Sequence, residues 1–106
     1  MSSRFKSIIK SERPVLVDFY ADWCQPCKEV SPILKEVKDT FKENIRIIKV
    51  NVDNKPYIAS LYQVKSIPTL ILFKQGTVQW SCVGLVDKAE ITSVINQHVN
   101  TNKQTL

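Results

Sequence analysis

The amino-acid sequence predicts one α/β domain in which a mixed sheet of about four strands has helices on both faces. Its 106 residues are enough for one hydrophobic core and too few for two domains of ordinary size. Apolar stretches with the period of strands alternate with stretches that have the period of helices. A long helix joins the first two strands, which should be parallel, and a short turn joins the last two, which should be antiparallel. We therefore expect residues 1–106 to form a single domain.

The first half of the chain shows the clearest changes of period. Residues 3–11 carry apolar side chains at helical spacing, which predicts a short amphipathic helix. Residues 14–21 are apolar on both alternating faces, which is typical of an interior strand covered on both sides. From residue 24 to about residue 43 the period is helical, with Pro26 in the first turn, where a missing N–H costs little. Pro32 lies further along, where we expect a kink.

The second half contains shorter elements. They are expected in the order strand 45–52, helix 56–63, a strand directly after Pro68, turn 74–77, strand 78–83, helix 87–99 and a polar tail, 100–106. Within the short helix we expect Ile58, Leu61 and Tyr62 to face inward. The elements therefore follow the order α-β-α-β-α-β-β-α.

Composition and charge exclude several classes of protein. The formal net charge is +5, but the lysines are spread along the chain, so we predict a solvated basic surface and no nucleic-acid partner. No apolar run approaches the ~20 residues of a membrane span and no signal peptide is visible, so we expect a cytoplasmic protein with no membrane partner. Only two glycines occur, which argues against a Gly-rich phosphate loop or dinucleotide-binding turn, so we expect no cofactor.

The chemistry is expected at the start of the long helix, where Trp23-Cys24-Gln25-Pro26-Cys27 follows the first strand. Two cysteines at this spacing can close a small disulfide ring. The N–H groups and dipole at a helix N-terminus favour an anion, so the pKa of the Cys24 thiol should be lowered and its thiolate should be nucleophilic. Cys27 lies one turn in and is expected to be more shielded. The spacing predicts two-step exchange, in which Cys24 attacks a partner's disulfide and Cys27 resolves the mixed disulfide.

Two other interpretations of the cysteine pair are less well supported. A structural zinc ion needs four ligands, and beyond the pair only Cys82 and His98 could supply them, so we predict no metal site. The pair could also be two structural thiols at a strand-to-helix junction. Cys82 is expected to be a core or half-buried residue and His98 a packing residue at a helix end, whereas the sequence does not place Trp80 on the surface or in the core.

The chain resembles the thioredoxin family from Pro14 to Val99. Several stretches fall in the order of the family, which is far more specific than one cysteine pair: 15–28, 49–53, 66–74 and Val83-Gly84. The resemblance implies the thioredoxin fold and a thiol–disulfide oxidoreductase whose partners are disulfide-containing proteins. It also implies a second partner, a thioredoxin reductase dependent on flavin and NADPH, which itself binds both of these cofactors.

Asp18 is a carboxyl group in the middle of the first, apolar strand. Burial should raise its pKa, because an ionised carboxylate is costly in an apolar interior. By the resemblance, Asp18 would lie close to Cys27 and exchange a proton with it, with Lys49 nearby. An aspartate with only a structural, hydrogen-bonding role is the alternative.

Ile67-Pro68 matches the cis-proline bond that faces the disulfide in this family, and cis peptides are essentially confined to X–Pro bonds. The resemblance implies that the backbone of Ile67 pairs with an extended partner segment. An ordinary trans proline that opens a strand is the alternative. The other substrate-binding residues that the resemblance implies surround Cys24: Trp23, Gln25, Pro26, Val83 and Gly84, with Asp22 and Asp53 as acidic neighbours.

The sequence departs from the family at three loop positions. Gln25 stands where the family usually has glycine, which can alter the redox potential or the choice of partner. Pro26 is kept, and in this family that residue goes with a reducing character. Gln63 and Ser66 stand on the approach to Pro68, where the family often has glycine, so this loop should be stiffer.

The N-terminus is short for this family, since only 13 residues precede Pro14. The strand that usually comes first is therefore expected to be shortened or missing, and strand 45–52 should become an edge of the sheet. An apolar, unpaired edge invites association. We predict either a dimer through 45–52 or an edge shielded by the N-terminal residues.

Two other functions remain as alternatives. A thiol oxidant, isomerase or cytochrome-maturation module would work outside the cytoplasm, which the lack of a visible signal or anchor segment disfavours. A redox-inert binding subunit would use the fold as a scaffold with incidental thiols. The joint presence of Cys24, Cys27, Asp18 and Pro68 argues against this second alternative.

Overall fold

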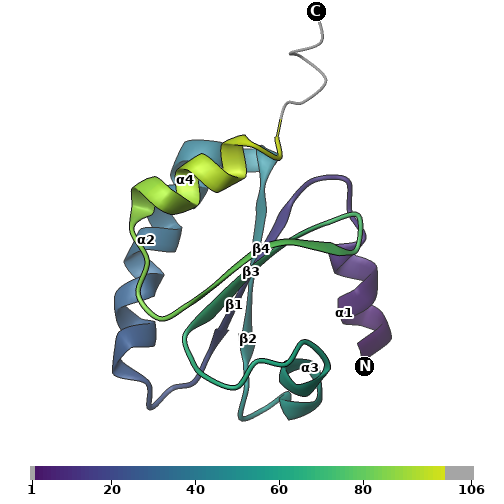
Figure 1. The fold of residues 1–106 in the computed structure, drawn as a ribbon, viewed down its shortest axis with the longest axis vertical. Helices are drawn as coiled ribbons and strands as arrows, with labels where there is room; N and C mark the ends of the chain where they lie inside the picture. Colours follow the sequence, from purple (N-terminus) through teal and green to yellow (C-terminus); the bar gives the residue numbers. More distant parts are fainter. Residues whose placement is uncertain (1, 100–106) are drawn as a thin grey trace, which may run out of the picture.

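The computed structural model describes residues 2–99, so the predicted polar tail, 100–106, lies outside the described residues. Its elements, shown in Figure 1, are α1 (Ser2–Ile9), β1 (Val15–Tyr20), α2 (Gln25–Phe41), a 3₁₀ turn (Lys42–Asn44), β2 (Arg46–Asn51), α3 (Pro56–Leu61), β3 (Thr69–Lys74), β4 (Thr77–Val83) and α4 (Lys88–Asn96). The predicted order of helices and strands is confirmed. The 3₁₀ turn is an element that the sequence did not predict.

The four strands form one mixed sheet in the order β2-β1-β3-β4. β1 and β2 are parallel, with Val15 beside Arg46 and Tyr20 beside Asn51, and α2 is the crossover between them. β3 runs antiparallel to both β1 and β4. The predicted mixed sheet, with its parallel first pair and its closing hairpin, is therefore confirmed.

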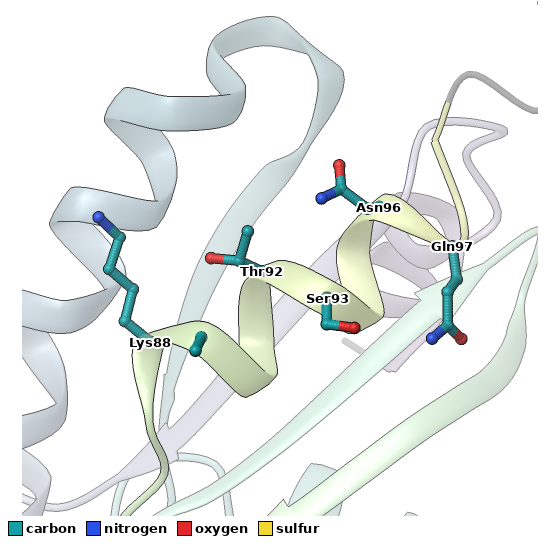
Figure 2. Close-up of a pocket in the computed structure, with 6 residues that line it drawn as sticks. Lys88, Thr92, Ser93, Asn96 and Gln97 are labelled. Atoms are coloured by element: carbon teal, nitrogen blue, oxygen red, sulfur yellow. The ribbon is translucent and has the colours of Figure 1, made fainter.

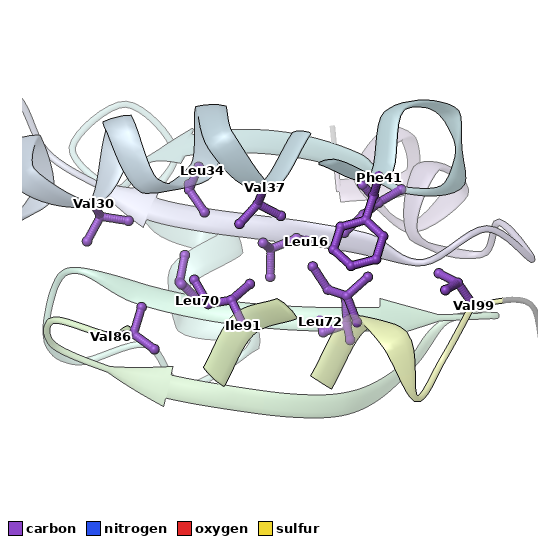
Figure 3. Packing of buried hydrophobic residues seen from close by; sticks show 12 residues of the cluster. Leu16, Val30, Leu34, Val37, Phe41, Leu70, Leu72, Val86, Ile91 and Val99 are labelled. Carbon is purple, nitrogen blue, oxygen red and sulfur yellow. The ribbon is translucent and has the colours of Figure 1, made fainter. Parts of the chain in front are cut away.

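Helices cover both faces of the sheet, α2 and α4 on one and α1 and α3 on the other (Figure 1). On the first face, the apolar stripe of α2 points toward Leu16, Leu70 and Leu72 of the sheet (Figure 3). On the second face, Phe5 of α1 packs edge-on against Phe73 of β3, with ring centroids 6.0 Å apart. The strand residues divide between the two faces by simple alternation, as the period of two requires.

The hairpin between β3 and β4 turns through residues that need a left-handed backbone. Gln75 has φ 54° and Gly76 has φ 82°, which suits a two-residue turn whose twist matches the strands. The N–H of Gly76 donates to the carbonyl of Ile9 at 2.9 Å, and that of Gln75 to the carbonyl of Ser11 at 2.9 Å. These two bonds join the hairpin to the end of α1.

The N-terminal region agrees with the expectation of a missing first strand. Within residues 2–99, α1 precedes β1 directly and β2 has only β1 as a neighbour, so β2 is an edge strand. Phe5 and Ile9 of α1 are buried on the face of the sheet next to this edge. The prediction that Leu61 of α3 faces inward is wrong, because 48% of it is exposed. None of the helices described has the length and apolar character needed to cross a membrane.

Candidate functional site

The redox pair lies where β1 ends and α2 begins. Cys24 is the N-cap of α2, with extended backbone angles (φ −88°, ψ 109°), and Pro26 occupies the first turn. Cys24 and Cys27 form a disulfide whose Cα atoms are 5.3 Å apart. The N–H of Cys27 donates to Sγ of Cys24 at 3.2 Å, so the cysteine sulfur takes the place of the usual capping oxygen. The N-terminus of α2 is thereby directed at Cys24.

The two cysteines are equally buried in the disulfide form, each with 3% of its surface exposed. The expectation that Cys27 is the more shielded of the two is therefore wrong for this state. Both pack in a small apolar cluster with Ala21, against which Ile67 also packs. What distinguishes the two sulfurs is the helix, because only Sγ of Cys24 accepts a helix N–H among the bonds found for the pair.

Asp18 is fully buried in β1 between Lys49 of β2 and Leu70 of β3. By alternation it lies on the same face as Leu16, which is the face that α2 covers. Burial raises the pKa of its carboxyl to about 6, although the positive charge of Lys49 acts in the opposite direction. Neither carboxylate oxygen has a hydrogen-bond partner in the described part of the chain. The predicted rise in pKa is confirmed. The alternative, an aspartate that forms only structural hydrogen bonds, gains no support, because no described residue hydrogen-bonds to the carboxylate.

Lys49 lies beside Asp18 but directs its ammonium group elsewhere. Its Nζ donates to Oγ of Ser31 in α2 at 3.0 Å and lies 4.9 Å from the ring centroid of Tyr20. Across residues 2–99, the ion pair found is Lys88 with Glu36. Lys49 therefore acts on Asp18 through its field rather than through a salt bridge.

The loop before β3 contains the predicted cis bond, between Ile67 and Pro68. Pro68 is buried, and its carbonyl accepts the N–H of Gly84 at 2.8 Å. Gly84 has φ 92°, and a Cβ built on it would meet nothing within 4 Å. Gly84 therefore combines a backbone conformation that L-residues rarely adopt with open space in front of it.

Large apolar side chains are exposed around this loop. Trp23 is 70% exposed and Val83 is 64% exposed, so the described part of the chain leaves most of both side chains uncovered. Nε1 of Trp23 donates to Oδ2 of Asp53 at 2.9 Å, which fixes the indole against the turn after β2. Leu85 is 57% exposed and is a further large apolar side chain next to Gly84 that the sequence did not single out. Its position directly after Gly84 was the available signal.

Comparison with known proteins agrees with this geometry. Residues 1–97 match the family model described as thioredoxin. A thioredoxin from Acidithiobacillus ferridurans is 41% identical over 92 residues, which cover 87% of this chain and 85% of the relative. A thioredoxin from Rickettsia felis is 41% identical over 98 residues, covering 92% and 93% of the two chains. The chain belongs to the thioredoxin family. It is a thiol–disulfide oxidoreductase.

Solved structures place the chain among thioredoxins as well. A mutant thioredoxin from Halobacterium salinarum has a TM-score of 0.83 at 31% identity, and the match covers 92% of this chain and 85% of the other. The oxidised form of mitochondrial thioredoxin 3 from Saccharomyces cerevisiae has a TM-score of 0.81 at 30% identity, with 91% and 89% covered. The thioredoxin fold is thus shown by sequence and by structure.

The positions where this thioredoxin departs from the family pattern have a structural explanation. Gln25 and Pro26 are both exposed, so the longer side chain at residue 25 extends into solvent. Gln63 has φ 58°, so the backbone keeps a left-handed conformation although glycine is absent. The carbonyl of Ser66 accepts the hydroxyl of Thr69 at 2.6 Å, which ties the loop to β3.

The remaining candidate residues lie apart from the redox pair. Cys82 is a free, half-buried thiol on β4, and burial together with Glu90 raises its pKa. His98 is half-buried past the end of α4, where its Nδ1 lies 2.9 Å from the carbonyl oxygen of Val94. Trp80 is half-buried against the core between the sheet and α2 and α4. Cys82 and His98 therefore lie as predicted, and the position of Trp80 is resolved.

Away from the redox site, residues 2–99 form a shallow hollow but no metal-binding cluster. In the described chain, no group of three or more His, Cys, Asp and Glu side chains is arranged to hold a metal ion. A shallow hollow on α4 is lined by residues of that helix and Gln97 just after it (Figure 2). Thr92 in this hollow has a buried hydroxyl without a hydrogen-bond partner among the described residues, but no cysteine lines the hollow.

Proposed function

We propose that this thioredoxin reduces protein disulfides by the route that its redox pair supports. The thiolate of Cys24 attacks one sulfur of the partner's disulfide, that S–S bond breaks, and the other partner sulfur leaves as a thiolate. The thiolate of Cys27 then attacks Sγ of Cys24 in the mixed disulfide and releases the second partner sulfur. The partner gains two electrons, and the protein ends with the Cys24–Cys27 disulfide found in this structure. The observation that carries the proposal is the helix N–H of Cys27 directed at Sγ of Cys24.

Asp18 is proposed to take the proton of Cys27 before the second attack and to return it during recharging. A pKa of about 6 lets the carboxyl exchange protons close to neutral pH. Its oxygens are buried and have no partner in the described chain, so they are not held in a competing hydrogen bond. Lys49 is proposed as a positioning residue that limits how far burial raises the pKa of Asp18.

Partner proteins are proposed to dock as an extended segment beside cis-Pro68. The backbone of Ile67 would pair with that segment, and the surrounding rim would supply contacts with little sequence demand. The rim consists of Trp23, Gln25, Pro26, Val83, Gly84 and Leu85, and Trp23, Val83 and Leu85 in it are exposed apolar side chains. A solved neighbour concerns thiol resolution in yeast mitochondrial 1-Cys peroxiredoxin via glutathione and thioredoxin systems, which supports protein partners of this kind.

A flavin- and NADPH-dependent thioredoxin reductase is the proposed source of electrons, and the cytoplasm is the proposed compartment. Retention of Pro26 supports a reducing potential near the roughly −270 mV of thioredoxin, and a value above roughly −180 mV would favour the oxidant or isomerase alternative. The sequence predicts either a dimer through 45–52 or an edge shielded by the N-terminal residues. The cations that line the grooves beside this edge disfavour the dimer, because two copies would bring like charges together.

Reduction of insulin disulfides with NADPH and a thioredoxin reductase tests the proposal. The protein should turn over catalytically, Cys24→Ser should be inactive, and Cys82→Ser should be as active as the wild type because that thiol is outside the pair. Absence of turnover by the wild type would contradict the proposed function. Replacement of both Cys24 and Cys27 by serine tests the binding-subunit alternative, because a binding subunit would keep its function without the two thiols.

A further inference from the structure

Apart from the redox site, the edge strand β2 is the surface best suited to a partner. The N–H groups of Arg46 and Val52 point inward and donate to carbonyls of the β1 segment at 3.0 and 2.9 Å. The N–H and C=O of one strand residue point to the same side, and this side alternates along the strand. Ile47, Lys49 and Asn51 therefore direct their N–H groups outward, and Ile47 and Lys49 also direct their carbonyls outward. In the sheet formed by residues 2–99, no strand lies on that side. The edge therefore offers a row of outward backbone donors to an added strand.

A groove lies beside β2 on each face of the sheet. The α1–α3 groove, of about 600 Å³, has an apolar floor that includes Phe5, Ile48 and Ile58, with Arg4 and Lys55 also lining it. The α2 groove, of about 280 Å³, lies on the opposite face. It is lined by Ser31, Leu34, Lys35, Lys38, Ile47 and Lys49. An added strand would therefore find space for side chains on both of its faces.

The charge at this edge has one sign. Cations line both grooves, and Arg46 is exposed on the strand itself. The cations in the grooves are Arg4, Lys35, Lys38, Lys49 and Lys55. No aspartate or glutamate of the described chain lines either groove, and the ion pair found in residues 2–99 involves none of these cations. A partner that supplies carboxylates would complement this surface.

We propose that β2 and its two grooves bind an extended, acidic segment of another protein by β-strand addition. A second copy of this chain fits less well, because pairing two identical edges would bring the same cations together in a protein of net charge +5. A nucleic acid would use the cations but neither the apolar floor nor the backbone carbonyls of the edge. The acidic strand uses all three features.

The two grooves also define the side-chain pattern of the segment. In a strand, side chains alternate between the two faces, so apolar residues would enter the α1–α3 groove while every second residue points to the other face. There Lys35 and Lys49 would meet carboxylates. The segment that fits best therefore alternates apolar and acidic residues.

A fluorescein-labelled peptide, acetyl-(Glu-Val)₄-amide, is the probe for this proposal, with binding followed by fluorescence anisotropy. The peptide should bind the wild type, and the double variant Lys35→Glu/Lys55→Glu should lose about tenfold or more in affinity, because each reversal replaces an attraction by a repulsion. The matched control Lys10→Glu/Lys65→Glu has the same net charge but lies outside both grooves, and it should retain the wild-type affinity. Equal losses in both variants would overturn the proposal, and circular dichroism checks that both are folded.

Three further measurements separate strand addition from other occupants. N-methylation of either all valines or all glutamates removes the donors along one edge of the peptide, and one of these two forms should lose most of the binding. If both forms bind like the parent, or if a twelve-nucleotide oligothymidine binds as tightly as the peptide, strand addition is wrong. Sedimentation should show a monomer. A dimer that Lys35→Glu/Lys55→Glu disrupts would overturn the proposal, because it would assign the edge to a second copy of the chain.

Discussion

The redox site and the β2 edge lie on the same small sheet but differ in how firmly the structure holds their functional groups. At the redox site the backbone sets the geometry: an N-cap at Cys24, a cis bond before Pro68 and a positive φ at Gly84. At the β2 edge, long exposed cations surround an open strand, and none of them is held in an ion pair within residues 2–99. Single substitutions should therefore have large and local effects at the redox site, and partial, additive effects at the edge.

The largest effect is expected from Cys24→Ser. Without the attacking thiolate no mixed disulfide can form, so insulin reduction should fall by roughly a thousandfold or more, as for other essential nucleophiles. Coupled NADPH oxidation measures this loss. The control, Cys82→Ser, removes the free thiol on β4 and should retain full activity. Comparable losses in the two variants would remove the distinction between Cys24 and an ordinary thiol.

A second prediction concerns the buried charge of Asp18. Because the folded-state pKa is raised to about 6, the folded protein binds this proton more tightly than the unfolded chain, and ionisation destabilises the fold as the pH rises from about 4 to about 6. Asp18→Asn should therefore increase the free energy of unfolding by on the order of 2 kcal/mol at pH 8, and by little below pH 4. Urea unfolding at the two pH values measures it.

Asp18→Asn should also slow the release of the mixed disulfide at neutral pH, because Cys27 loses its proton acceptor. Asp22→Asn serves as the control, since Asp22 is exposed and should show neither effect. If Asp18→Asn leaves the free energy of unfolding at pH 8 unchanged, then ionisation of the buried carboxyl does not destabilise the fold. That result would weaken the assignment of Asp18 to proton transfer.

A third prediction compares the two glycines. Gly84→Ala and Gly76→Ala each place a Cβ on a backbone with positive φ, so each should lose about 1 kcal/mol of stability. Only Gly84 lies in the docking rim, so only Gly84→Ala should also raise KM for insulin. Steady-state kinetics separate the two, and an equal KM in both variants would count against the rim.

The smallest effect is expected at Gln63. Its φ of 58° suits glycine, so Gln63→Gly should increase the free energy of unfolding by about 0.5 kcal/mol, with part of the gain offset by the greater freedom of glycine in the unfolded chain. Gln97→Gly is the control, since Gln97 has φ −71° and glycine there should destabilise the protein. Thermal unfolding of the two variants should therefore shift in opposite directions.

The sequence predicts the elements better than it predicts the orientation of single side chains. Periodicity is a local property, and it suffices for every α-helix and strand. The lengths of the connections add the parallel pair β1–β2 and the antiparallel pair β3–β4, whereas the pairing of β1 with β3 was not predicted. Leu61 lies at the end of a short helix, where a small rotation decides which way a residue faces, and its predicted orientation is wrong. The equal burial of Cys24 and Cys27 depends on the packing of Ile67, a residue distant in the sequence, and no local pattern contains it.

The candidate site shows the same division. Asp18 could be found because a carboxyl group is unusual inside an apolar strand. Cys24 and Cys27 could be found because two cysteines with this spacing stand where the period changes from strand to helix. The bond from Trp23 to Asp53 and the exposure of Leu85 could not, since both arise where separate loops meet. The residue type of Gln63 does not indicate its left-handed backbone, because glutamine is not typical of such a turn. The available signal was the resemblance, since the family often has glycine near this position.

The most direct test of the central claim is to trap the mixed disulfide. In Cys27→Ser the second step is blocked, so incubation with a disulfide-containing protein should accumulate a covalent complex through Cys24. Peptide mapping by mass spectrometry after proteolysis identifies the cysteine in the bond. We expect attachment at Cys24 alone. Attachment mainly at Cys82, or no complex while the wild type reduces the same protein, would contradict the proposed mechanism.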